Sequence, residues 1–232
     1  MDTFIQGAIK ALELLISGNS DVFQVMKLTL TVSGTATVIS VFFGVPLGLW
    51  LALEDFVGKQ ALTSLVHFGM GLPPVVVGLV VSLFLWRSGP LGNLGLMYTP
   101  TAMIVAQAMI ACPIIAGFSF AAIVSINPKL RLRLLSMGAM PWQANWLLIK
   151  EAKLGLIAAV IAGFGRVISE VGASMMVGGN IKGQTRVLTT AVVMEVGKGN
   201  YDVALAIALI LLIIAYSIIV SLTLLQHDKK IL

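Results

Sequence analysis

The segment Val203–Leu225, VALAIALILLIIAYSIIVSLTLL, contains no charged residue. At about 1.5 Å per residue, a helix of this length exceeds the roughly 30 Å of hydrocarbon in a bilayer. The same character extends through the chain, because 58% of its 232 residues are hydrophobic, 11% are charged and the mean hydropathy is +1.01. A soluble domain of this composition could not cover its surface with polar groups. The sequence therefore predicts an all-α membrane protein.

Four further apolar stretches are long enough to cross a bilayer, so we expect a polytopic bundle of about five transmembrane helices. They run approximately over Gln24–Leu53, Leu62–Trp86, Thr101–Val124 and Ala152–Val177. Residues 24–232 would then form one transmembrane domain, which leaves no room for a soluble domain of ordinary size. Any energy source must come from another protein.

The N-terminal residues 1–23 predict a separate element. Apolar and polar residues alternate at helical spacing in Thr3–Ser17, which favours an amphipathic helix lying at the membrane interface. A secretory signal is less favoured, because a basic beginning and a small-residue cleavage pattern are both missing. We expect the segment to stay on the mature protein.

The basic residues of the connections predict the orientation. They crowd the connection between the third and fourth spans, at about 125–151, so we expect this loop to be cytoplasmic. Five spans place the two termini on opposite sides. The basic residues expected inside are Lys59, Lys129, Arg131, Arg133, Lys150, Lys153, Lys229 and Lys230, and those expected outside are Arg87, Lys182, Arg186 and Lys198.

Prolines and glycines are predicted to interrupt several spans. Pro73 and Pro74 fall near the middle of the second span, Pro113 lies in the third, and Gly44-x-Pro46-x-Gly48 lies in the first. Proline removes a backbone donor, so the freed carbonyls need protein or water around them. Two interpretations remain open at Pro73 and Pro74, which are a packing kink and an unwound backbone that lines a translocation pathway.

Several polar residues fall inside the spans. Arg166 and Glu170 are four residues apart in the fourth span, so they should share a helix face and could form an ion pair. The pair could lock helices together, or it could belong to a gate whose partners exchange. Ser169, Ser174 and Asn180 could offer neutral donors along a pathway, although hydroxyls in helices often bond their own backbone.

Other functions find little support in the sequence. The single cysteine, Cys112, and two isolated histidines, His67 and His227, predict no disulfide, metal site or redox chemistry. The net charge of +5 is expected of a membrane protein, whose basic residues lie in cytoplasmic loops and near lipid headgroups. No nucleic-acid motif accompanies this charge. Gly178–Thr185, GGNIKGQT, has the glycine spacing of a phosphate-binding loop but lacks its lysine and follows an apolar helix.

The segment Leu132–Leu156, LRLLSMGAMPWQANWLLIKEAKLGL, is long for a connection and is both basic and apolar. Apolar residues on a segment expected in the cytoplasm need a partner surface. A helix folded against the membrane surface is the alternative. The apolar anchors are Leu134, Leu135, Trp142, Trp146 and Leu147.

This segment resembles the signature loop of binding-protein-dependent ABC importer permeases, in which Glu-Ala-Ala, three residues and a glycine precede nine residues and Ile-x-Leu-Pro. Gly138 matches the central glycine, and Ala139, Pro141 and Trp142 follow it as in many members. The sequence departs from the pattern at both ends. Leu132–Leu134 replace Glu-Ala-Ala, and Leu148, Lys150 and Glu151 replace the final isoleucine, leucine and proline.

Two further segments resemble the molybdate and tungstate permeases of this group. Leu72–Gly78, LPPVVVG, is similar to their Leu-Pro-Pro-Val-Val-x-Gly element. Phe164–Ala173, FGRVISEVGA, is similar to their Phe-Ala-Arg-x-Leu-Gly-Glu-Phe-Gly-Ala stretch, and residues 179–185 continue it. The likeness covers about Val25–Leu225 and points most closely to the tungstate permeases.

The resemblance implies a type I ABC importer permease fold in the cell inner membrane and a role in tungstate import. It further implies a homodimer of permeases, two cytoplasmic ABC ATPase subunits that bind ATP and Mg, and an extracytoplasmic oxyanion-binding protein. This chain would then hold no catalytic residue and no cofactor. The residues expected to couple to the ATPase are Leu134, Leu135, Gly138, Ala139, Pro141 and Trp142, and those expected on the pathway or gate are Pro73, Pro74, Arg166, Ser169, Glu170, Ser174 and Asn180.

Four alternatives remain at this point. A molybdate permease is the nearest, and a sulfate permease is less favoured. A carrier driven by an ion gradient would need titratable groups within the membrane, for which Arg166 and Glu170 are the main candidates. A membrane scaffold has no need of broken helices.

Overall fold

The computed structural model describes residues 7, 9–11, 13 and 20–227. The predicted amphipathic helix Thr3–Ser17 lies mostly outside the described residues, as do Lys229 and Lys230. Of that helix, residues 7, 9–11 and 13 are described and are helical, and Ala11 is buried against α10 and α11. The expected separation of residues 1–23 from the rest stays a prediction.

Three long helices are apolar enough to cross a membrane as single elements: α2 (Ser20–Leu53), α5 (Pro100–Val124) and α11 (Tyr201–His227). Two further helix pairs are long and apolar enough to cross a membrane only when the two helices of each pair are taken together. The first pair is α3 (Lys59–Met70) with α4 (Pro74–Leu85), bent by 100°, and the second is α8 (Lys153–Ile168) with α9 (Gly172–Gly178), bent by 57°. The described chain therefore holds three to five spans, in agreement with the expected number.

Two predicted interruptions were wrong, and the fourth span has a break between α8 and α9 that was not predicted. The first and third spans are continuous despite Pro46 and Pro113, since α2 and α5 run through them. Neighbouring helices can compensate for the missing hydrogen bond of a proline within a bundle. The predicted break at Pro73 and Pro74 is confirmed, because α3 ends at Met70 and α4 begins at Pro74.

The remaining elements are short. A 3-10 turn, η1 (Gly92–Leu94), lies between α4 and α5, and the helices α6 (Pro128–Ser136) and α7 (Pro141–Glu151) lie between α5 and α8. Residues 178–202, expected to be a simple connection, contain an additional apolar helix, α10 (Leu188–Gly197). Its ten residues are too few to cross a bilayer, so hydropathy over a long window does not detect it.

The centre of the bundle is the contact between α2 and α5. Small residues recur every four positions on α2, at Ala36, Ser40, Gly44 and Gly48, and all four are buried. A Cβ added to Gly44 would lie 2.8 Å from the carbonyl oxygen of Cys112, so the two backbones are in direct contact. The Ser40 hydroxyl donates to the carbonyl oxygen of Ala108 at 3.1 Å. Small residues allow this close approach of membrane helices, and packing rather than hydrophobicity holds them together there.

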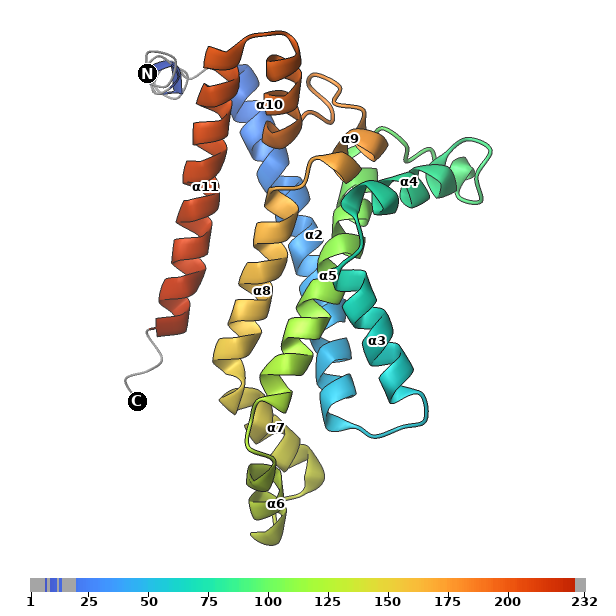
Figure 1. Ribbon diagram of the computed structural model, residues 1–232, viewed down its shortest axis with the longest axis vertical. Helices are drawn as coiled ribbons and strands as arrows, with labels where there is room; N and C mark the ends of the chain where they lie inside the picture. Colours follow the sequence, from blue (N-terminus) through green and yellow to red (C-terminus); the bar gives the residue numbers. More distant parts are fainter. Residues whose placement is uncertain (1–6, 8, 12, 14–19, 228–232) are drawn as a thin grey trace.

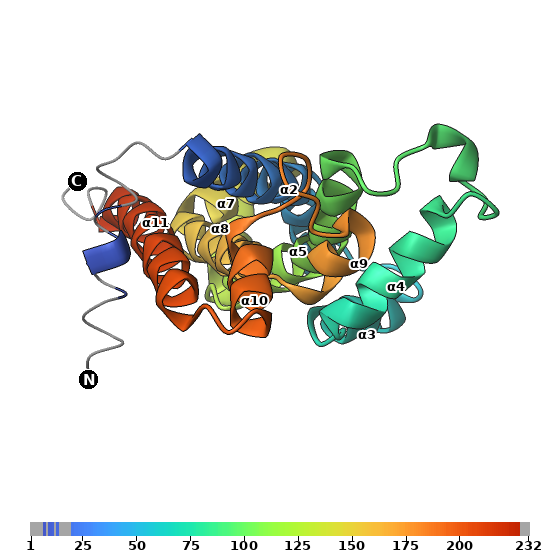
Figure 2. The same ribbon diagram turned by 90° about the horizontal axis from the view of Figure 1, so that it is seen from above.

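The connections gather at two ends of the molecule (Figure 1). We call the end with residues 54–58, α6 and α7 the hairpin end, and the end with residues 87–99, 179–187 and 198–200 the far end. α2 starts at the far end, and α11 finishes toward the hairpin end. The view from above places α11 beside α10 on one flank, while α4 projects from the other (Figure 2). This division of the connections matches the two sides predicted from the basic residues.

Candidate functional site

The hairpin end carries two short helices joined by a tight turn. α6 starts with an Asn127 cap, whose Oδ1 accepts from the Lys129 amide at 2.9 Å. The turn contains Gly138 at φ +87°, in the left-handed region that favours glycine. Arg131 Nε donates to Asn145 Oδ1 at 3.2 Å and so links α6 to α7. The loop that resembles the permease signature is therefore a helical hairpin whose turn depends on its central glycine.

This α6–α7 hairpin exposes large apolar side chains. Leu134, Leu135 and Ala139, expected to couple to the ATPase, are half-buried. Exposure of 84% at Met137 and 65% at Trp142 shows where the free apolar surface lies. Sequence reasoning did not select three of its members, Leu132, Met137 and Met140, because helical spacing alone does not show which face stays uncovered. The exposed set is Leu132, Met137, Met140, Trp142, Trp146 and Leu147.

The hairpin is joined almost directly to a membrane helix. α7 ends at Glu151, α8 begins at Lys153, and Ala152 between them is buried. Ala144 and Leu148 are also buried, so one side of α7 is packed while the other is exposed. A displacement of α7 would therefore be transmitted to α8 through a single residue.

The break between α8 and α9 is built around Glu170. Its Oε2 lies 3.6 Å from Arg166 Nη1, so the predicted ion pair is confirmed. The expected geometry was wrong, because α8 ends at Ile168 and the two residues do not share a continuous helix. Glu170 Oε1 instead accepts from the Ala173 amide at 3.0 Å, in the first turn of α9. Glu170 is 3% exposed, and its two partners compensate for burial of the carboxylate.

The two broken spans pack against each other. A Cβ added to Gly78 of α4 would lie 2.7 Å from the Cα of Ala173 in α9, and one added to Gly172 would lie 2.7 Å from Cγ2 of Val75. The two segments that resemble oxyanion permeases, Leu72–Gly78 and Phe164–Ala173, are therefore in contact. Pro73 itself is extended, at φ −62° and ψ 125°, and gives way to Pro74 in the first turn of α4.

The remaining predicted pathway residues have different surroundings. The Ser169 hydroxyl bonds the carbonyl oxygens of Gly165 and Arg166, at 2.9 and 3.1 Å, as expected for a serine that satisfies its own backbone. Ser174 is 1% exposed and accepts from Gln107 Nε2 at 3.1 Å. Gln107 is a buried amide that sequence reasoning missed, although its place in the apolar α5 was a signal. Its Oε1 has no partner among the described residues.

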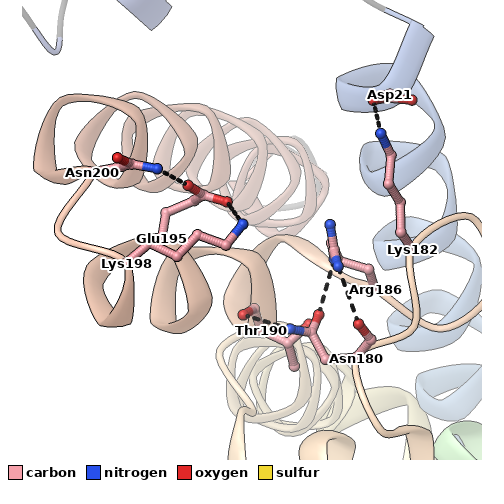
Figure 3. A network of polar contacts seen from close by, with 8 residues as sticks. All are labelled: Asp21, Asn180, Lys182, Arg186, Thr190, Glu195, Lys198 and Asn200. Carbon is pink, nitrogen blue, oxygen red and sulfur yellow. Dashed lines mark hydrogen bonds and ion pairs between the residues drawn. The ribbon is translucent and has the colours of Figure 1, made fainter.

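Asn180 lies at the far end, in the loop that follows α9. Its φ of +52° is rare for a residue with a side chain. Its Oδ1 and its carbonyl oxygen accept from Arg186 Nε and Nη2 at 3.3 and 3.4 Å, and its Nδ2 donates to the Thr190 carbonyl oxygen at 3.5 Å (Figure 3). Thr185, which is fully buried, holds the same loop through a 2.5 Å bond to the Gly178 carbonyl oxygen.

A cavity of about 610 Å³ opens beside this loop. It lies between the start of α2, residues 182–186, α10 and the start of α11. Lys182 pairs with Asp21 at 2.5 Å, and Lys198 pairs with Glu195 at 2.8 Å (Figure 3). The charged residues that line the cavity are Asp21, Lys27, Lys182, Arg186, Glu195 and Lys198.

Glu195, at the far end of α10, keeps its charge. A hydrogen bond from Asn200 Nδ2 at 2.8 Å, followed by the bond from Lys198, holds the pKa of Glu195 below its ordinary value of 4.5. The positive charges of Lys198 and Arg186 act in the same direction, and burial opposes them. The carboxylate therefore remains an acceptor that fixes Lys198 and Asn200 at the edge of the cavity.

The fold is that of type I ABC importer permeases. The methionine ABC transporter MetNI, in an inward-facing conformation, superimposes with a TM-score of 0.73 at 22% identity over 94% of this chain and 96% of that chain. A bacterial alginate ABC transporter in complex with a periplasmic protein gives 0.67 at 23% identity, over 89% of this chain and 78% of that chain.

Sequence similarity identifies the family and the relatives of this chain more narrowly than the fold does. The chain belongs to the family described as binding-protein-dependent transport system inner membrane component, whose profile matches residues 44–231. It is 40% identical to the tungstate uptake system permease protein TupB of Peptoclostridium acidaminophilum, over 94% of this chain and 96% of that protein. The TupB of Campylobacter jejuni is 34% identical, over 93% and 90%. The predicted resemblance is thereby confirmed.

Proposed function

We propose that this protein is the membrane-spanning permease of an ATP-driven, binding-protein-dependent importer of tungstate. The observation that carries the proposal is the 40% identity to a tungstate uptake permease over nearly the whole of both chains. Relatives named for molybdenum and sulfate transport are 25% and 26% identical. A relative from Haloferax volcanii, 41% identical, is a probable anion ABC transporter permease, which agrees with an oxyanion as cargo. Molybdate remains the second candidate, since it matches tungstate in charge and shape.

In this proposal the hairpin end faces the cytoplasm of a cell whose inner membrane holds the protein. Two ABC ATPase subunits bind ATP and Mg there, and two copies of this chain form the pore. The exposed apolar face of the α6–α7 hairpin seats on an ATPase, because surface such as Trp142 and Met137 needs a partner. The extracytoplasmic oxyanion-binding protein docks at the far end. The chain itself contributes no catalytic group and no cofactor.

In this proposal, movement of the ATPase is transmitted to the membrane helices along the covalent chain. ATPase closure displaces the hairpin, and Ala152 passes the displacement to α8. α8 ends at the Glu170 break, which packs against the Pro73–Pro74 break through Gly78 and Ala173. A bundle of packed helices responds by switching between discrete arrangements rather than by gradual deformation. The two breaks are therefore the places where the pathway opens and closes.

Tungstate uptake tests the cargo. Cells that lack this chain should lose high-affinity tungstate uptake and regain it when the chain is restored. Molybdate should compete more strongly than sulfate. Unchanged tungstate uptake together with lost sulfate uptake would contradict the assignment. ATP hydrolysis by the assembled complex distinguishes the importer from a gradient-driven carrier. For the importer, hydrolysis should rise only when the loaded binding protein is present.

Cysteine labelling tests the orientation. Lys129→Cys and Gln143→Cys, each in a Cys112→Ser background, should resist an impermeant thiol reagent applied to intact cells. The same residues should react in inside-out vesicles. Ready labelling from outside the cell would invert the orientation and remove the hairpin from contact with a cytoplasmic ATPase.

A further inference from the structure

The far-end cavity carries more positive charge than its partners neutralise. Lys182 and Lys198 are each paired with a carboxylate, Asp21 and Glu195 respectively. Neither Lys27 nor Arg186 forms an ion pair with any residue that the structure describes, although both line the same cavity. Among the lining residues that the structure describes, four cations against two carboxylates leave a formal charge of +2.

Arg186 is held in place by neutral acceptors. Nε and Nη2 of its guanidinium bond to Asn180 through the side-chain and backbone oxygens, at 3.3 and 3.4 Å. Both acceptors belong to one residue on one side of the guanidinium, so a second ligand can approach the remaining Nη. Because the Asn180 bonds involve no opposite charge, they orient Arg186 without neutralising it. Arginine fixed in this way is well suited to a tetrahedral oxyanion.

We propose that this cavity is a transient binding site for a tetrahedral oxyanion dianion, with Arg186 and Lys27 as its ligands. The inference rests on the proposed function, since it makes the cavity the first stop of the cargo after release from the binding protein. A dianion balances the two unpaired cations, whereas a monovalent anion leaves one of them uncompensated. Charge and shape alone do not separate tungstate from molybdate here, so selection between them belongs elsewhere.

The surroundings of the site favour weak binding. Lys27 and Lys182 are exposed, Arg186 is half-buried, and the cavity is wide enough to keep the ion partly hydrated. The carboxylates of Asp21 and Glu195 lie on the same lining and repel the cargo. Interactions between exposed charges are screened by water and salt. A site of this kind holds the ion briefly and releases it, as an importer requires.

The site is also connected to the helix break. Asn180, which holds Arg186, donates to the carbonyl oxygen of Thr190 in α10. The neighbouring Thr189 donates through its hydroxyl to the carbonyl oxygen of Glu170 at 2.9 Å. Hydrogen bonds and the peptide link between Thr189 and Thr190 therefore connect Arg186 to the break where α8 ends.

Equilibrium dialysis of the assembled transporter tests the site. Radiolabelled tungstate is added to the purified permease–ATPase complex, without binding protein, at low ionic strength. We expect weak, saturable binding that weakens about tenfold in Arg186→Gln and further in Arg186→Gln with Lys27→Gln, because each lost cation removes on the order of one decade of affinity. Sulfate should compete, and chloride at the same ionic strength should compete far less.

Two controls separate a site from a general surface effect and from misfolding. Arg87→Gln removes the same charge in the far-end connection 87–99 but outside the cavity lining, and it should bind tungstate as the unaltered complex does. Arg186→Lys should recover part of the affinity. Equal losses in Arg87→Gln and Arg186→Gln would overturn the proposal, as would unchanged binding in the double variant.

The outcome is independent of the cargo assignment. Lost tungstate uptake in cells without the chain, combined with normal binding by the double variant, would retain the proposed function and overturn the cavity site. Cation-dependent binding of sulfate and tungstate, combined with unchanged tungstate uptake in those cells, would retain the oxyanion site and overturn tungstate as the transported ion.

Discussion

The close contact of α2 with α5 makes a sharp prediction for Gly48. A Cβ at this position would meet the carbonyl oxygen of Ala116, and would lie 2.8 Å from Ser119 Cβ and 2.9 Å from the amide nitrogen of Phe120. These are mainly backbone atoms, which cannot rotate away. Ordinary contact begins near 3.4 Å, so Gly48→Ala forces the helices apart by at least about 0.6 Å. Gly34, on the same helix, has no atom within 4 Å of its added Cβ and supplies the matched control.

The free energy follows from the displacement. A gap of this size removes about a quarter of the dispersion attraction across the contact, or roughly 1.5 kcal/mol for some 40 atom pairs. The Ser40 bond to Ala108, now 3.1 Å, stretches beyond useful length and costs about 1 kcal/mol more. Alanine returns up to about 1 kcal/mol through its helix propensity. Gly48→Ala should therefore destabilise by about 1.5 kcal/mol, and Gly34→Ala should be neutral or stabilise by up to about 1 kcal/mol.

Thermal unfolding in detergent measures the difference. For a chain of this length, about 2.5 kcal/mol corresponds to roughly 5–10 °C between the melting temperatures of the two variants. Both variants should insert in the membrane, because hydropathy is nearly unchanged. A Gly48→Ala protein that melts at or above the temperature of Gly34→Ala would refute the close-packing argument.

Three further predictions concern the hairpin, the break and the far end. Gly138→Leu should reduce uptake while membrane insertion stays normal, because only glycine and asparagine adopt φ near +87° at low cost; Gly138→Asn should retain more transport, and equal activity of the two would remove the turn from the mechanism. Alanine at Arg166, at Glu170 and at both should give a double-mutant cycle in which the double change is less harmful than the sum, measured by thermal unfolding, while strict additivity would show no direct interaction. The pKa of Glu195 is lowered on folding, so its stabilisation is complete above the ordinary value of 4.5 and is lost only as the pH falls through the lower folded value. The melting-temperature difference between the unaltered protein and Glu195→Gln should thus hold from pH 7 to 5.5 and disappear in stronger acid; a difference already lost at pH 6 would contradict the assignment.

Hydropathy located the spans because the transfer free energy of apolar residues adds along the chain, whatever the tertiary contacts. Breaks within spans were less predictable. Pro73 and Pro74 mark one break directly, but the break near Glu170 contains no proline and depends on a side chain that caps the next helix. Conversely, Pro113 leaves α5 continuous. The local sequence indicates which backbone hydrogen bonds a proline removes. Whether other groups replace them depends on the helices packed around it.

The candidate sites show the same limit. The hairpin glycine was identified because the loop resembles the permease signature, whose central glycine Gly138 matches. The cation-lined cavity was not, since Lys27 and Arg186 come from segments far apart in the chain and meet only after folding. In the sequence the charge of Arg186 indicated only the side of the membrane, and Lys27 fell within the predicted first span. Ser174 was selected as a polar residue, but its partner Gln107 could be known only from the structure.

The contact between Gly78 and Ala173 has a consequence for protein engineering. Gly78 and Gly172 present no side chain to the opposite broken span, so a larger residue has no room at either position. A chimera that takes LPPVVVG from one permease should fold best when FGRVISEVGA comes from the same parent. The two segments, distant in the chain, should therefore be transferred between relatives as one unit.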